Sequence, residues 1–504
     1  MNSVELFRYQ IRILAEELRE LETTIESRRD FWPLWLKELY WTVTKLVGLG
    51  HWHDGSRPQR RHRAVVAADS TSARALVGNC PRPRVLIDAT HTVQSGRKDG
   101  VQRVVRNIAF HAARGEKAIP FVLEDGLPMV LSNGEMSSVP LEIEKGDILV
   151  LLDVTPLSTI SPLLDNIHER GGKIVSVVYD LVPLKYPGTC PASYTFEFKN
   201  RLETILAKCD SVIAISNSVV DDLERFMRSS TDVCRDELRL GWFHLGCDLD
   251  EIDGEPSPDT AAMVAEHPFF VTVGTIEPRK GHPIALDAFE RLWAAGSQAR
   301  YVIAGRYGWS ARAVVTRIRN HPEFGKRLLW VEGPDDATLQ FLYRNAAALV
   351  SPSIAEGFGL PLIEAARYGT SIIVSDLPVF REICGQHALY FDVADDAALA
   401  QQIDACLSGR APRPDFEVLT WSDATDLFLS LVREDKCLEQ RWRSFERNNG
   451  AVQYLEAASK AKKAVEEVIP NDLKQFPRDE WAPRRLETPD PHSPGATSAV
   501  TPRG

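Results

Sequence analysis

The sequence predicts an α/β protein made of two doubly wound halves, each a parallel sheet covered by helices. From Arg84 onward, short β-branched apolar runs alternate with helical or turn-rich segments, the pattern of strands buried on both faces of a parallel sheet. A polar, proline-bearing segment at residues 248–262 interrupts this pattern, which then begins again. Two such halves imply a cleft between them, and ligands bind there at the carboxyl ends of the strands.

The apolar runs place the strands and set the expected domain limits. The runs of the first half are residues 84–90, 147–154, 173–183 and 211–216. Those of the second half are residues 269–276, 300–306, 327–333, 347–353, 371–376 and 388–393. We therefore assign residues 84–250 to the first domain, 251–267 to a linker and 268–432 to the second domain.

Residues 1–83 are expected to form a helical extension. Its first segment has apolar residues at alternating steps of three and four, the heptad pattern of a short coiled coil. These residues are Val4, Phe7, Ile11, Leu14, Leu18, Leu21 and Ile25. Because such a helix cannot bury its apolar stripe alone, the pattern predicts self-association.

An aromatic helix follows the heptads at residues 30–52 and precedes a basic run at residues 57–63. It carries Trp32, Trp35, Tyr40, Trp41 and Trp52, with lysines between them. Indole rings and cations suit the surface of an anionic bilayer, so this helix predicts peripheral membrane contact. The alternative is that it packs on the protein itself. After a helical segment at 433–469, residues 470–504 are rich in proline and charge, and we expect a disordered tail.

The composition limits the class of protein. The chain has 504 residues, and its net charge of -11 argues against general nucleic-acid binding, which needs clustered positive charge. Its eight cysteines include no C-x-x-C pair, and it has no signal-peptide pattern or apolar run long enough to span a bilayer. We therefore expect a cytoplasmic protein with reduced thiols that contacts a membrane, if at all, from the inner face.

Candidate site residues cluster in the second half, where two cations follow its first strand. The segment VGTIEPRKGH places Gly274 after the strand and puts Arg279 and Lys280 just before a helix. Two cations beside a helix N-terminus form a site for a diphosphate. Arg306 follows the next strand in the segment VIAGRYG and supplies a further cation.

Two carboxylates lie farther along, at a strand end and on the helix that follows. In EGFGLPLIEA, Glu356 should lie at the carboxyl end of a buried strand, Gly357 to Leu360 should form the turn, and Glu364 should lie on the first turns of the next helix. The residues that follow Glu356 supply backbone amides, and the two glycines among them allow a ligand to approach closely. They are Gly357, Phe358, Gly359 and Leu360.

The first half contributes a second wall of the predicted cleft. Its opening strand is followed by a loop with Gly96 and Gly100, and then by a helix whose N-terminal amides should face the cleft. Tyr179 and Asp180 end a later strand of the same half and should face the cleft as well.

These segments carry a resemblance to a known family. In their order and spacing, residues 274–281, 304–308 and 351–370 resemble the retaining, nucleotide-sugar-dependent glycosyltransferases of family 4, the group 1 glycosyl transferases. The fold of that family is the GT-B architecture, with two Rossmann-like domains facing a cleft. The resemblance covers Arg84 to Val432 and is strongest from Phe269 to Val393. Residues 87–107 and 179–187 are similar to the acceptor side of bacterial members that build surface polysaccharides, several of which are mannosyltransferases.

The resemblance implies a role for each matching residue. Glu364 should hold the ribose hydroxyls of the nucleotide, because a carboxylate can accept two hydrogen bonds from a vicinal diol. Glu356 should hold hydroxyls of the donor sugar, with the amides from Gly357 to Leu360 around it. Arg279 and Lys280 should neutralise the departing diphosphate, so that neither a divalent metal nor a cofactor is needed.

The chain also departs from the family pattern at two positions. Many members have an arginine where this chain has Thr275, so the second phosphate cation must be Arg279 or Arg306. A histidine is common where this chain has Tyr179, which puts in doubt a histidine-based role at the donor anomeric centre.

The predicted function is transfer of a hexosyl group, with retention, from a nucleotide-diphosphate sugar to a glycan or lipid-linked acceptor in bacterial polysaccharide biosynthesis. Two alternatives remain open at this point. A phosphorylase or sugar-nucleotide epimerase could use the same fold and the same phosphate cations. The chain could also be a non-catalytic, nucleotide-sugar-binding scaffold assembled through its heptads.

Overall fold

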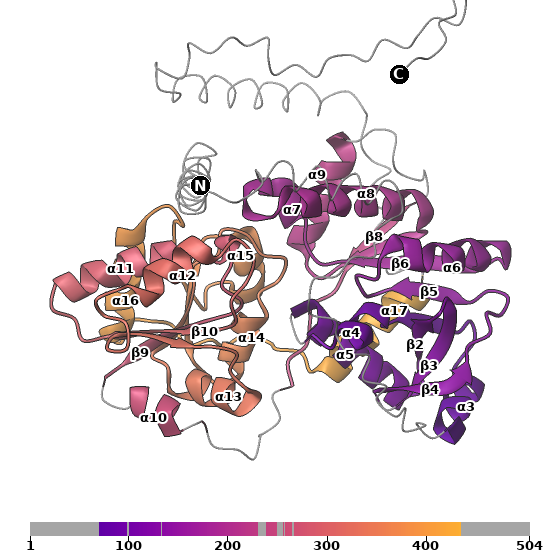
Figure 1. Ribbon diagram of the computed structural model, residues 1–504, viewed down its shortest axis with the longest axis horizontal. Coiled ribbons are helices and arrows are strands. Elements are labelled where there is room, and N and C mark those ends of the chain that lie inside the picture. The colour runs from indigo at the N-terminus through magenta and orange to yellow at the C-terminus, as the bar shows by residue number, and fades with distance from the viewer. Residues whose placement is uncertain are drawn as a thin grey trace, which may run out of the picture. The chain divides into compact units, whose positions relative to one another are not determined.

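The computed structural model describes residues 70–97, 100–132, 134–229, 238–248, 256, 258–264 and 267–434 (Figure 1). The predicted coiled coil, the aromatic helix and the tail lie outside these residues. The segment expected to form C-terminal helices, 433–469, is described only as far as Glu434. Within the described part of the chain, no helix has the length and apolarity needed to cross a bilayer.

The first half is an eight-stranded sheet with the order β4-β3-β2-β1-β5-β6-β7-β8. Strands β2, β1, β5, β6, β7 and β8 pair in parallel, and β3 and β4 extend the sheet as antiparallel neighbours of β2. The strands are β1 (Val85–Asp88), β2 (Ile119–Glu124), β3 (Leu127–Ser132), β4 (Glu135–Pro140), β5 (Ile148–Leu151), β6 (Lys173–Val178), β7 (Ser211–Ala214) and β8 (Arg239–Trp242). The four strands predicted from apolar runs are confirmed, whereas β2, β3, β4 and β8 were missed.

The second half is a six-stranded, all-parallel sheet with the order β11-β10-β9-β12-β13-β14. Its strands are β9 (Phe269–Val273), β10 (Arg300–Ala304), β11 (Leu328–Val331), β12 (Ala348–Ser351), β13 (Ser371–Ser375) and β14 (Leu389–Phe391). All six predicted strands are confirmed. Counted along the chain, this order is 3-2-1-4-5-6, which reverses direction between β9 and β12. In open parallel sheets, such a reversal is the point at which ligands bind.

Helices cover the sheets as the sequence predicted. Those before and around the first sheet are α3 (Ser70–Asn79), α4 (Thr90–Ser95), α5 (Gly100–Arg114), α6 (Leu157–Glu169), α7 (Val182–Lys185), α8 (Ala192–Lys208) and α9 (Asn217–Ser229), with the 3₁₀ turn η1 (Pro187–Thr189). Those that follow are α10 (Pro258–Val264), α11 (His282–Ala294), α12 (Arg312–Arg319), α13 (Asp336–Asn345), α14 (Leu360–Arg367), α15 (Pro378–Cys384), α16 (Asp396–Leu407) and α17 (Trp421–Arg433), with the 3₁₀ turn η2 (Pro278–Lys280).

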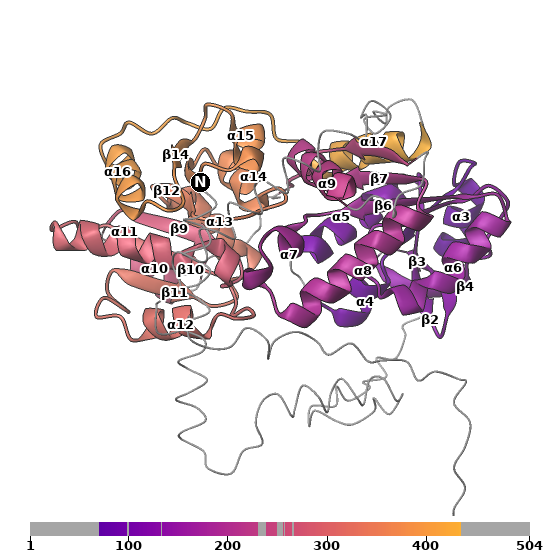
Figure 2. The ribbon, with the colours of Figure 1, turned by 90° about the horizontal axis from the view of Figure 1, so that it is seen from above.

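The core of the second half follows from the period of its strands. Alternate residues of a strand point to opposite faces, so Phe270 packs with Phe289 of α11, and Val271 belongs to the cluster that contains Leu342 of α13. Helices α11 and α16 lie side by side on the first of these faces (Figure 2). Burying one such large apolar side chain stabilises the fold by about 1.5–3 kcal/mol. This burial fixes the strand ends from which the site loops leave.

Helices α3 and α17 pack on the first half of the chain. The expected domain limits assign α3 to the N-terminal extension and α17 to the second domain. Helix α17 follows the second sheet in the chain, yet it packs on α5 of the first half, and the Phe243 and Phe428 rings lie 4.9 Å apart (Figure 1). Helix α3 precedes Arg84, yet it contacts β3 and β4, and its Leu76 is buried with Leu86. The limits at residues 83, 250 and 268 stay predictions, but α3 and α17 share the core of the first half.

A carboxylate of the second half caps a helix of the first half. Glu382 of α15 accepts hydrogen bonds from the backbone N–H groups of Asn217 and Ser218, both at 2.8 Å, and from Ser218 Oγ at 2.9 Å. His244 Nε2 lies 2.8 Å from the same carboxylate. The first amides of a helix lack partners within the helix, and a negative charge there is favourable. Glu382 therefore stabilises α9 and ties the halves together.

We expect Glu382→Gln to lower the free energy of unfolding by about 1.5–3 kcal/mol near neutral pH, because it removes a charge that accepts several hydrogen bonds. Burial raises the pKa of Glu382, but the hydrogen bonds from His244 and from the α9 amides outweigh burial and lower that pKa. A lowered native pKa means that the stabilisation exists above the ordinary glutamate pKa and is lost as the pH falls through the native value.

Denaturant unfolding of the wild type and the glutamine variant between pH 3 and pH 8 measures both effects. The difference in stability should be largest above about pH 5 and should shrink in acid. Glu417→Gln, at an exposed position of the same half, is the control. A difference that stays constant over the whole pH range would contradict this role of Glu382.

Candidate active site

Two loops at the switch point of the second sheet carry the candidate site. The loop after β9 leads through Gly274 and η2 into α11, and the loop after β12 leads through Glu356 into α14. As predicted, Glu364 lies on α14, which begins at Leu360. Glu356 lies in the loop and not at the strand end as predicted, because β12 already ends at Ser351. The backbone N–H of Ile354 donates to the Arg279 carbonyl at 2.8 Å and fastens the two loops to each other.

The carboxylate of Glu356 is shared by the two predicted phosphate cations. Lys280 Nζ lies 2.6 Å from Glu356 Oε1, and Arg279 Nη1 lies 2.7 Å from Oε2. Ser353 Oγ donates a third hydrogen bond to Oε1 at 2.8 Å. Burial raises the pKa of Glu356, but Arg279 and Lys280 outweigh burial and lower that pKa to about 2. Glu356 is therefore an anion at physiological pH, held by two donors that a phosphate could also bind.

Two further acids surround this cluster. Arg279 Nη2 also lies 2.6 Å from Oε1 of the buried Glu277. Asp180, at the end of β6 in the first half, lies close enough for the charges of Arg279 and Glu356 to act on its pKa. Burial raises the pKa of both Glu277 and Asp180, and Arg279 partly offsets this rise. The cluster thus contains three acids and only two bases. An anionic ligand could therefore bind Arg279 and Lys280 only if these cations leave Glu356.

Gly274 makes room for Lys280. Its φ of 142° favours glycine, and a Cβ there would lie 3.4 Å from Lys280 Cε. The half-buried Thr275 packs with its Cγ2 against Gly308. Arg306 is exposed at the end of β10. Among the described residues, no hydrogen bond or ion pair joins Arg306 to the Glu356 cluster, so the structure brings Arg279 and Lys280 together there without it.

The glycine-rich loop lies directly against the first half. A Cβ on Gly357 would fall 1.8 Å from the carbonyl oxygen of Tyr179, and Ser216 Oγ donates to the Gly357 carbonyl at 2.8 Å. Only glycine allows this approach of backbone to backbone. The hydroxyl of Tyr179 donates to the Leu152 carbonyl at 2.7 Å, so in this structure its hydrogen is used within the first half.

The other loop residues position the helix that carries Glu364. Phe358 is buried and meets the His244 ring edge-on, with centroids 5.6 Å apart. Gly359 has a φ of 106° and is the N-cap of α14, whose first residue is Leu360. The Phe358 side chain and the Gly359 backbone thus anchor the loop. The backbone amides of the loop are the groups predicted to contact a ligand.

Glu364 is fully engaged by two residues that the sequence reasoning missed. Its Oε1 accepts a hydrogen bond from Arg103 of α5, and its Oε2 accepts one from the Tyr343 hydroxyl at 2.6 Å. The Glu364 side chain is only 4% exposed, whereas that of Arg103 is 30% exposed. Arg103 lies within the segment GVQRVVRN, which begins at Gly100, but a single arginine on a helix gives no signal of a partner 261 residues away.

The predicted loop of the first half is described only in part. Gly96 ends α4 with a φ of 63°, and Gly100 begins α5; both are exposed. Residues 98–99 between them lie outside the described residues. Whether the N-terminus of α5 binds an anion stays a prediction.

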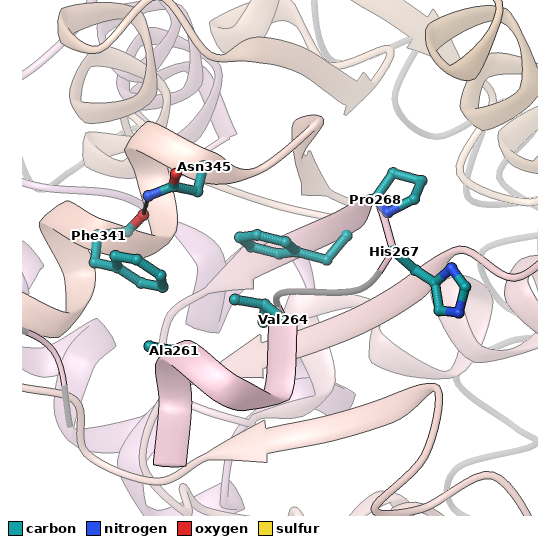
Figure 3. A pocket seen from close by; sticks show the side chains of 7 residues that line it. Ala261, Val264, His267, Pro268, Phe341 and Asn345 are labelled. Carbon is teal, nitrogen blue, oxygen red and sulfur yellow. Dashed lines mark hydrogen bonds between the residues drawn. The ribbon is translucent and has the colours of Figure 1, made fainter. Parts of the chain in front are cut away.

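A pocket of about 440 Å³ lies away from this cluster (Figure 3). Its lining comes from α10, from the start of β9 and from α13, and includes Val264, His267, Phe341 and Asn345. Since Phe269 begins β9, this pocket lies at the amino edge of the sheet, opposite the loops that carry Glu356. We therefore base the candidate site on the ion-paired cluster and not on this pocket.

Comparison with known proteins identifies the second half. Residues 259–417 match a family described as "Glycosyl transferases group 1". This segment is a group 1 glycosyl transferase domain. It contains Glu356, Glu364, Arg279 and Lys280, so the cluster described above lies inside the group 1 domain.

Proteins similar in sequence to this chain include mannosyltransferases. The serotype-specific mannosyltransferase WbdA of Escherichia coli is 32% identical over 373 residues, which cover 69% of this chain and 46% of that protein. The O-antigen chain mannosyltransferase RfbU of Salmonella typhimurium is 27% identical over 222 residues, covering 44% of this chain and 56% of that protein. The chain thus matches about half the length of these relatives.

Solved structures also resemble the chain, at low sequence identity. Sucrose-phosphate synthase from Thermosynechococcus elongatus is 18% identical, with a TM-score of 0.47, over 76% of this chain and 99% of that one. The two sheets of the chain, each with parallel strands covered by helices, agree with the two-domain GT-B architecture that the sequence resemblance implied.

We expect Arg103→Met to lower the free energy of unfolding by about 1–3 kcal/mol, because it leaves the buried Glu364 with Tyr343 as its remaining donor. Partial exposure of Arg103 places the effect toward the lower end of that range. Chemical denaturation measures the loss. Arg114→Met, at the exposed end of the same helix, should change stability by less than about 0.5 kcal/mol. Equal effects of the two substitutions would contradict the tie between Arg103 and Glu364.

Proposed function

We propose that this protein is a retaining glycosyltransferase that moves a hexosyl group from a nucleotide-diphosphate sugar to a glycan or lipid-linked acceptor in bacterial polysaccharide biosynthesis. The sharing of Glu356 by Arg279 and Lys280 at the switch point carries the proposal. The similarity to mannosyltransferases supports mannose as the transferred sugar. Because the chain matches about half the length of these relatives, the transferred sugar and the acceptor are proposals for this chain.

In the proposed reaction, Arg279 and Lys280 exchange the Glu356 carboxylate for the diphosphate of the donor. A diphosphate offers oxygens that bind Lys280 and the guanidinium of Arg279 as well as the Glu356 carboxylate does. When the donor binds, the cations turn to the diphosphate, and the two Glu356 oxygens become free to accept hydrogen bonds from sugar hydroxyls. The same contacts then neutralise the charge that develops on the leaving nucleoside diphosphate, without a metal ion.

The ribose contact requires a rearrangement. Both oxygens of Glu364 accept hydrogen bonds, and the carboxylate is almost fully covered. Tyr343 is fully buried, so Arg103 is the partner that solvent reaches. A ribose diol that binds Glu364 would therefore take the place of Arg103.

The chemical step needs positioning more than a side-chain base. The acceptor oxygen forms its bond to the anomeric carbon on the face from which the diphosphate departs, so that configuration is retained. The bond from the anomeric carbon to the phosphate oxygen breaks, and the acceptor proton moves to a phosphate oxygen. The protein holds the two substrates and stabilises the phosphate charge through Arg279 and Lys280.

We expect Lys280→Ala to weaken nucleoside diphosphate binding by about 1.5–3 kcal/mol, roughly 10- to 150-fold, because a charge-assisted contact to phosphate is lost. Glu356→Ala should abolish transfer. Calorimetry with UDP, GDP and ADP, and turnover with the corresponding sugars and a lipid-linked glycan acceptor, measure the two effects. Lys326→Ala, at an exposed site of the same domain, should leave both unchanged.

Three outcomes would contradict the proposal. Unchanged binding and turnover in Lys280→Ala and Glu356→Ala would remove the site. Release of a free sugar phosphate or an isomerised nucleotide sugar without any acceptor would indicate a phosphorylase or an epimerase. Nucleotide-sugar binding with no product in any acceptor screen would indicate a scaffold.

We also propose that the N-terminal extension supports self-association and contact with the inner face of the cytoplasmic membrane. Because α3 packs on the first sheet, the deletion that tests this should end before Ser70. Removing residues 1–69 should leave nucleotide affinity intact and release the protein from anionic vesicles in a flotation assay. Equal vesicle binding by the shortened protein would refute the membrane contact. An unchanged number of chains per particle in solution would refute the self-association.

A further inference from the structure

Two exposed aromatic side chains, Tyr194 and Trp309, meet beside the candidate site. Of the seven exposed aromatic residues in the described part of the chain, four lie on two short segments, at the start of α8 and after β10. They are Tyr194 (47% exposed), Phe196 (66%), Tyr307 (48%) and Trp309 (40%). Apolar groups that gather on a surface in this way commonly mark a binding site.

The two segments come from different halves and meet. The rings of Tyr194 and Trp309 lie 6.3 Å apart with an interplanar angle of 33°. Trp309 Nε1 donates to the Thr189 carbonyl at 3.2 Å, which fixes the indole against the turn that precedes α8. Tyr194 and Trp309 are thus held as neighbours while each ring stays partly open to solvent.

This aromatic pair borders the ion-paired cluster. The backbone N–H of Gly308 donates to the Ile276 carbonyl at 3.0 Å, and Ile276 directly precedes Glu277. On the other side, partial burial raises the pKa of Tyr194 to about 12, and the charges of Asp180, Glu277 and Arg279 also act on it. The Tyr194 and Trp309 rings therefore lie next to the proposed donor site.

We propose that Tyr194 and Trp309 form a stacking site for a sugar residue of a glycan acceptor. A pyranose has an apolar face of C–H groups and a rim of hydroxyls, which matches an aromatic ring that ends in a polar group. The inference rests on the proposed transfer reaction, because it places the acceptor next to the donor. It goes further by naming the residues that recognise the acceptor and its chemical class.

The surroundings favour a neutral glycan over an anionic lipid. None of the four aromatic residues is charged, and the charges that act on Tyr194 include two acids, Asp180 and Glu277, against the single cation Arg279, so a lipid phosphate gains little there. A neutral sugar ring has no charge for these acids to repel, and its hydroxyls can donate hydrogen bonds to the half-buried Asp180.

The test measures binding of short glycans to the full-length protein. A panel of α- and β-linked hexose trisaccharides, including mannotriose, is titrated by saturation-transfer NMR, and nucleoside diphosphates are titrated separately by calorimetry. We expect Tyr194→Ala and Trp309→Ala each to weaken trisaccharide binding by about 3- to 10-fold, with nucleotide affinity unchanged. Tyr194→Phe and Trp309→Phe retain a ring and should restore most of the affinity.

Phe110→Ala removes an aromatic ring of similar exposure, 46%, from α5 and should have no effect on either ligand. Equal losses of trisaccharide and nucleotide affinity in the alanine variants would show a merely structural role and overturn the inference. If the wild type binds nucleotide but no trisaccharide, or binds only vesicles that contain a polyprenyl phosphate, the stacking site is wrong and the donor site stands. A wild type that binds no nucleotide would overturn the proposed function instead.

Discussion

The reversal of strand order between β9 and β12 is the constraint on which the candidate site depends. Parallel strands deliver all their carboxyl ends to one edge, and a reversal sends the adjacent loops to opposite faces of the sheet. Glu356 and the pair Arg279–Lys280 leave from these two strands and meet there, with contacts of 2.6 and 2.7 Å. The apolar core holds the strands and so fixes the distance between the charges.

Electrostatics then sets the resting state of the cluster. Without a ligand, each cation is neutralised by a carboxylate of the chain itself, and the low pKa of Glu356 keeps this arrangement ionised over the physiological range. A buried charge left without a partner is costly, so the protein keeps these cations and carboxylates paired with each other. Under the proposed function, the same cations would pair with Glu356 in the unliganded protein and with the diphosphate when the donor binds.

Much of this arrangement could be predicted from the sequence, because it depends on local patterns. Buried parallel strands are continuous apolar runs, and all ten that were predicted are present. The antiparallel strands β3 and β4 were missed because Pro128 and polar residues break their pattern, although Asp125–Gly126 is a typical hairpin turn. The pairs that join Glu364 to Arg103 and Glu382 to α9 could not be predicted, since neither sequence spacing nor residue type shows which side chains meet across two domains.

The missing Cβ of Gly357 has a consequence for how the halves can move. The backbone of Gly357 touches the carbonyl of Tyr179, which follows β6. The carbonyl of Gly357 accepts a hydrogen bond from Ser216, which follows the neighbouring strand β7. Side chains in contact can change rotamer to accommodate a displacement. Two main chains in contact cannot. The two halves therefore cannot shift past each other at Gly357 without moving a main chain.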